Sequence, residues 1–170
     1  MTSLVEALFN VGVKVTHTSD GNFGVSSHTV TADDSQRFSG GTAATDEADV
    51  LYSKTRTISA SGSENLDLTG ALTDAFGATV AAAEVVAIYV KAHAGNANDV
   101  VVGGAASNAF NGPLSANGTL TIKPGEFTVL TNKAGWPVVA GTGDILKVAN
   151  SGAGTSVTYT IVIVGRSVAA

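Results

Sequence analysis

Apolar and polar positions alternate along most of the chain, which is the period-two pattern of half-buried β-strands. Near the N-terminus, Val11, Val13 and Val15 alternate with small or polar residues. Residues 85–91 are instead almost continuously apolar, as expected of a strand covered on both faces. The predicted strands cover residues 11–16, 23–31, 51–58, 64–68, 85–91, 99–102, 119–123, 126–131, 145–148 and 157–164.

Turn signals separate these strands. Residues 18–22 form a turn by composition, and Asn117-Gly118 is typical of a two-residue hairpin turn. Residues 33–49 show little periodicity and are predicted to be a long loop or linker. Residues 70–77 place apolar side chains at helical spacing, which predicts one helical turn or a compact loop.

The spacing of the strands, without repeated helical segments between them, favours an all-β fold, a single β-sandwich or jelly-roll-like domain. We place this domain at residues 49–170 and expect residues 1–48 to form an N-terminal arm or hairpin extension. The side chains expected to face each other across the two sheets are Val86, Ile88, Val90, Leu120, Ile122, Phe127, Val129, Ile161 and Ile163.

Composition limits the classes of partner. The chain has 170 residues, a net charge of -5 and only 14% charged residues. Nucleic acid and anionic membranes require clustered basic residues, so neither is an expected partner. The low charge suits a protein docked in an assembly, and equally a β protein with uncharged loops. The absence of cysteine excludes disulfides and thiolate sites, and no secretory signal is visible, which predicts a soluble protein made in the cytoplasm.

No catalytic or cofactor-binding motif is present. The histidines, His17, His28 and His93, lack metal-ligand spacing. There is no Gly-x-Ser-x-Gly elbow and no phosphate-binding glycine loop. The acidic residues show no sign that two of them converge as a glycosidase pair would. We therefore predict no catalytic, cofactor-binding or metal site and expect that the protein is not an enzyme.

Three weaker signals have simpler explanations. Asp20-Gly-Asn22 and Asp33-Asp34 offer oxygen ligands for calcium, but neither continues into a calcium-loop pattern. Asn117-Gly-Thr119 matches a glycosylation acceptor, which the hairpin turn explains without a secretory route. Trp136, the only tryptophan, is either an interface anchor or a plug at the end of the core, and we favour the core.

Several segments together resemble small virion proteins of tailed bacteriophages, the head decoration or cement proteins. In the first half of the match these are Ala48-Asp-Val-Leu-Tyr-Ser53, Arg56-Thr-Ile-Ser-Ala-Ser61, Glu64-Asn-Leu-Asp-Leu-Thr-Gly70 and Asp74-Ala-Phe-Gly77. In the second half they are Val101-Val-Gly-Gly104, Lys123-Pro-Gly125, Ala140-Gly-Thr-Gly-Asp144 and Tyr159-Thr-Ile-Val-Ile-Val-Gly165. The resemblance covers residues 45–167 and consists of strand and turn residues. Residues 1–44 lie outside it.

The resemblance implies a homotrimer bound to the outer surface of an icosahedral capsid, where it clamps neighbouring subunits of the major capsid protein. The N-terminal arm would reach a neighbouring subunit, and deleting residues 1–44 would then weaken capsid binding. Three alternatives stay open. They are a phage tail component (tube or fibre), a carbohydrate-binding β-sandwich module, and a glycan-degrading enzyme on a jelly-roll scaffold. The first would form rings or tubes alone, and the second would need exposed aromatic platforms.

Overall fold

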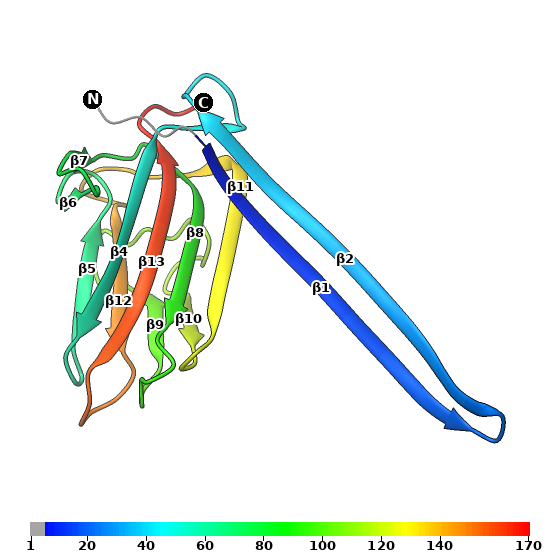
Figure 1. Ribbon diagram of the computed structural model, residues 1–170. Coiled ribbons are helices and arrows are strands. Elements are labelled where there is room, and N and C mark those ends of the chain that lie inside the picture. The colour runs from blue at the N-terminus through cyan, green and yellow to red at the C-terminus, as the bar shows by residue number, and fades with distance from the viewer. Residues whose placement is uncertain (1–5) are drawn as a thin grey trace.

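The computed structural model describes residues 6–170 as strands joined by turns, which confirms the predicted all-β fold (Figure 1). The strands are β1 (Glu6–Gly21), β2 (Gly24–Gly40), β3 (Glu47–Ala48), β4 (Val50–Ile58), β5 (Ser63–Asp67), β6 (Leu72–Thr73), β7 (Thr79–Val80), β8 (Glu84–Ala92), β9 (Val100–Gly103), β10 (Thr119–Ile122), β11 (Phe127–Pro137), β12 (Ile145–Asn150) and β13 (Val157–Arg166).

Two four-stranded sheets form the body, with orders β11-β8-β13-β4 and β10-β9-β12-β5. Strands of the first half pair antiparallel with strands of the second half in reverse order: β4 with β13, β5 with β12, β8 with β11, and β9 with β10. This is the pairing of one long hairpin that has been wrapped into two layers. The short strands β6 and β7 form a separate pair at one end of the body (Figure 1).

The core lies between the two sheets, where alternate residues of each strand point inward. In β13, Val157, Tyr159, Ile161 and Ile163 are each at most 1% exposed, as their alternation predicts. Not all the expected core residues lie there. Phe127 is 61% exposed, and Val129 is only partly buried. Val86 is buried outside the main core, in a second apolar cluster with Phe38 of β2. The other six expected core residues lie in the main core or pack against it.

The N-terminal strands form a long hairpin, the arm (β1 and β2), which projects away from the body (Figure 1). An unbroken antiparallel register runs from Glu6↔Ser39 to Gly21↔Gly24. The loop predicted at residues 33–49 is therefore wrong up to Gly40. This segment has no alternation of its own because pairing with β1, and not burial, holds most of it extended.

Of the two forms predicted for residues 70–77, the structure has the compact loop and no helical turn. The Asp74 carboxylate accepts the backbone N–H groups of Phe76 and Ala78 and closes a turn, and Leu72–Thr73 pair as β6. One smaller prediction differs in part from the structure. Asn117 adopts a left-handed conformation with φ of 61°, as a turn requires. However, no strand precedes that turn at Leu114, so it does not close the predicted hairpin.

A polar network joins the two sheets inside the sandwich. Glu64 on β5 accepts hydrogen bonds from the Nε of Arg56 at 2.6 Å and from the hydroxyl of Tyr159 at 2.9 Å. Burial, and then the charge of Glu64, raises the pKa of the Tyr159 hydroxyl far above its ordinary value of 10.0. The hydrogen bond to Glu64 raises the pKa of the Arg56 guanidinium.

We expect the free energy of unfolding to fall as the pH rises above about 10, the pKa of an unfolded tyrosine. Above that pH the hydroxyl of Tyr159 loses its proton in the unfolded chain but keeps it in the folded chain. The contribution of Tyr159 to the free energy of unfolding therefore falls by up to about 1.4 kcal/mol per pH unit. Urea unfolding from pH 9 to pH 11 measures it. In Tyr159→Phe neither state can ionise there, so its pH dependence should be shallower. Equal slopes in the two proteins would contradict the assignment.

Candidate interaction surface

The arm is amphipathic over its middle part, from Val11 to Val15, and toward its tip the same face carries His17 opposite His28 and Ser19 opposite Ser26. In its antiparallel register, directly opposed residues lie on the same face. One face carries Val11, Val13 and Val15 of β1, opposite Asp34, Ala32 and Val30 of β2. We call this the apolar face of the arm. Its four valines are between 48% and 57% exposed, so residues 6–170 leave it uncovered.

The opposite face of the arm is mainly polar, with Leu8 and Val25 as its exposed apolar side chains. Lys14 is opposite Thr31, and the hydroxyl groups of Thr16 and Thr29 lie 3.0 Å apart in a hydrogen bond. Nearer the body, Arg37 forms an exposed ion pair with Glu6 at 2.6 Å. Such a face is stable in water. The arm therefore has one solvated face and one face whose burial would lower the free energy.

Aromatic packing anchors the base of the arm to the body. Phe38 on β2 is completely buried, and Phe9 on β1 packs against its ring edge to face, with 6.5 Å between centroids. Both belong to a second apolar cluster, which includes Val86, Ala87 and Val164 of the body. The arm therefore begins in a packed cluster and continues into solvent with the same face apolar.

A buried arginine fixes the chain that leaves the arm. The side chain of Arg166 on β13 is 0% exposed, and its Nε and Nη2 donate to the Glu84 carboxylate at 2.9 and 2.6 Å. Its Nη1 also donates to the carbonyls of Thr45 and Glu47, in the segment after β2, and of Lys133 on β11, each at 3.3 Å. One side chain thus ties the root of the arm to both β8 and β11.

An isolated two-stranded ribbon is at best marginally stable in water. This arm extends through eleven register pairs, from Val11↔Asp34 to Gly21↔Gly24, beyond the packed rings at its base. Its exposed valines add a cost that only a further surface can remove. The arm is therefore the candidate functional site, because its exposed apolar face is available for contact with a further surface.

The structure separates most of the residues that the sequence offered for chemistry. His17 and His28 are directly opposed on the arm, next to the apolar pairs, whereas His93 lies in the turn after β8 and accepts the N–H of Gly95. Asp33 and Asp34, as neighbours in a strand, point to opposite faces of the arm. Across residues 6–170, no three histidine or acidic side chains gather where a metal ion could bind.

The other candidates from the sequence are the possible calcium ligands at the tip of the arm and the single tryptophan. Asp20 ends the arm, and Asn22 is in its tip turn. Trp136 is partly buried and packs against the main core, which confirms the core interpretation. The sequence showed that the valines of the arm alternate with small or polar residues, but it did not show that these valines are exposed. The signal in the sequence that could have indicated their exposure is the turn-rich segment beside them, which offers no apolar side chains to cover them.

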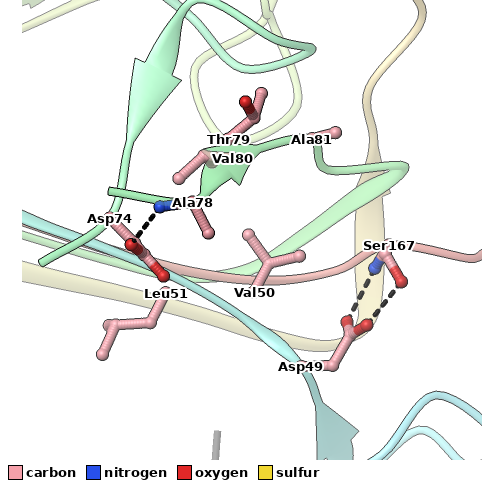
Figure 2. A pocket seen from close by; sticks show the side chains of 9 residues that line it. All are labelled: Asp49, Val50, Leu51, Asp74, Ala78, Thr79, Val80, Ala81 and Ser167. Atoms are coloured by element: carbon pink, nitrogen blue, oxygen red, sulfur yellow. Dashed lines mark hydrogen bonds between the residues drawn. The ribbon is translucent and has the colours of Figure 1, made fainter. Parts of the chain in front are cut away.

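A shallow pocket of about 280 Å³ lies on the body beside β4 and β7 (Figure 2). Its polar groups already bind within the chain. Asp49 accepts the backbone N–H of Ser167 at 2.7 Å and also its hydroxyl, and Asp74 accepts the N–H of Ala78 at 2.8 Å. No histidine lines the pocket beside Ser167 to act as its base. Asp74 closes a local turn, and Asp49 holds the segment after β13 against the start of β4.

In the part of the chain that the structure describes, no helix has the length and apolarity to span a bilayer. No protein-family model, curated protein or solved structure matches the chain.

Proposed function

We propose that this protein is a virion structural protein that binds the outer surface of a tailed-phage capsid and stabilises the shell by clamping neighbouring major capsid subunits. The observation that carries the proposal is the arm, with an apolar face that residues 6–170 leave uncovered. The resemblance of residues 45–167 to head decoration proteins is the reason for placing the protein on the outer surface of the capsid. Neither feature calls for a cofactor, a nucleic acid or a membrane.

We also propose that the sandwich is a jelly roll. The reverse-order pairing of β4, β5, β8 and β9 with β13, β12, β11 and β10 supports this topology. A jelly roll is an eight-stranded fold of two packed sheets. In a decoration protein such a body would sit on the shell while the arm makes contact with a neighbour.

A homotrimer with three arms would bind the shell at several points at once. Linked weak contacts raise the overall affinity far above that of each contact alone. Repetition over the capsid surface then stabilises the whole shell. In this assembly the arm reaches the neighbouring subunit, and the bodies sit on the major capsid protein.

The double substitution Val13→Asp and Val15→Asp is expected to lower the affinity for shells lacking this protein by about tenfold or more, equivalent to at least ~1.4 kcal/mol. The reason is that the bound assembly would bury two unpaired carboxylates, whether the arm packs on a capsid subunit or on a neighbouring copy of this chain. Both positions are exposed in the chain, so folding should be unaffected. Co-sedimentation with purified shells measures the affinity, and electron microscopy of the complexes locates the bound protein.

The matched control is Thr16→Asp with Thr18→Asp, which adds the same charge to the polar face of the same strand. Near-normal shell binding is expected of it. Wild-type protein that ignores shells but polymerises into rings or tubes would contradict the proposal and favour a tail component. Binding to glycans without binding to shells would also contradict it.

A further inference from the structure

The sheet β11-β8-β13-β4 also has an uncovered outer face. Val162, Tyr89 and Val129 stand side by side across β13, β8 and β11. The next row holds Lys91 and Phe127, and the rings of Tyr89 and Phe127 are 6.0 Å apart. With Phe127 61% exposed, this surface carries an aromatic pair of the kind that dominates protein interfaces.

Within one chain, the base of the arm already packs on one end of this sheet face. At its upper end, Val164 and Ala87 of the sheet pack against Phe38 and Phe9 of the arm. The arm then diverges from β11, and a cavity of about 260 Å³ separates it from Val129 and Thr131. Beyond this point the sheet face carries Tyr89, Val129 and Phe127 on its β8 and β11 side and hydroxyl pairs on its β13 and β4 side, Thr55 with Thr160 and Thr57 with Thr158. The apolar face of the arm and the β8 and β11 side of the sheet are both left open to solvent.

We propose that the apolar face of the arm in one copy of this chain packs on the outer face of the sheet β11-β8-β13-β4 in a second copy. The intermolecular contact would continue the one that each arm makes with its own sheet. The charges are complementary, because the arm face carries Asp34 and the sheet face carries Lys91. The inference rests on the proposed function only in taking the arm to bind a protein.

The size of the contact predicts a ring. Eleven register pairs of a two-stranded ribbon present about 350 Å², so one docked arm buries about 700 Å² in all, below the roughly 1,200–2,000 Å² of specific interfaces. Each copy donates one arm and receives one, which is a head-to-tail contact. Such contacts form a ring when the rotation between copies closes and an open filament when it does not, and closure gives each copy two interfaces. A closed trimer satisfies this count, and so does a dimer in which the two copies exchange arms reciprocally.

Cross-linking tests the contact directly, because the natural chain has no cysteine. Val13→Cys and Lys91→Cys chains with different tags are co-expressed and treated with a short bismaleimide. We expect a mixed dimer that contains both tags. Two controls move each cysteine to the other side: Thr16→Cys on the polar face of the arm, and Lys147→Cys on the outer face of the other sheet. Mixed dimers should be several-fold rarer with either control.

Dimers formed by Val13→Cys alone at the yield of the mixed product would overturn the proposal in favour of arm-to-arm pairing. Mixed product no more abundant than in the controls would also overturn it. Light scattering provides a second measurement: wild type should have the mass of a closed ring, and Val13→Asp a lower mass. No shells are present in either experiment. Failure here with normal shell binding would therefore make a capsid subunit the arm's partner and leave the proposed function standing.

Discussion

Replacing Arg166 with methionine is expected to lower the free energy of unfolding by about 3–5 kcal/mol, the cost of removing one partner of a buried ion pair. The change leaves the Glu84 carboxylate buried without its cation. It also leaves the carbonyls of Thr45, Glu47 and Lys133 without this donor. Urea unfolding followed by tryptophan fluorescence measures the loss, with Trp136 as the single reporter.

An exposed ion pair provides the comparison. Lys123 binds Asp99 at 2.7 Å, but its side chain is 69% exposed. Lys123→Met should therefore cost less than about 1 kcal/mol. The double variant Glu84→Leu with Arg166→Met removes both buried charges and should recover part of the loss. A loss below about 1 kcal/mol for Arg166→Met alone would contradict the role assigned to this residue.

Sequence patterns predicted the body well where each strand carries its own alternation. Residues 157–164 are an example, because every second side chain enters the core. The same patterns could not identify Arg166. Its partner Glu84 is 82 residues away, and an arginine that follows a glycine at the end of an apolar strand is indistinguishable in sequence from a solvated one. Long-range pairing of this kind leaves no local signal.

Periodicity also does not say what covers an apolar face. The alternation at Val11, Val13 and Val15 predicted a half-buried strand, and the structure leaves it exposed. In β11, Phe127 and Val129 alternate like core residues but point away from the core. In both strands, alternating apolar side chains do not face the core of their own chain. Both lie on the surfaces that we propose for assembly. An apolar stripe has the same pattern whether its cover is in the same chain or in another.

The free energy of opening the arm should depend on the packing at its base and should differ from the free energy of unfolding the whole chain. Phe38 is the only large side chain of β2 that is fully buried, and it contacts the body through Val86, Ala87 and Val164. Beyond it the arm shares no core with the sandwich. Regions with few buried contacts open independently of the global unfolding reaction. Losing Phe38 should therefore release the arm before it affects the sheets.

Phe38→Ala is expected to lower the free energy of opening of the arm by about 3 kcal/mol, near the lower end of the cost of deleting a buried phenylalanine ring. Hydrogen exchange followed by mass spectrometry measures it: β1 and β2 should lose protection, while β8 and β13 keep theirs. Phe23→Ala is the matched control, because Phe23 lies in the tip turn and is fully exposed. It should leave exchange at the base of the arm unchanged. Equal loss of protection in all four strands of Phe38→Ala would instead show that arm and body unfold as one unit.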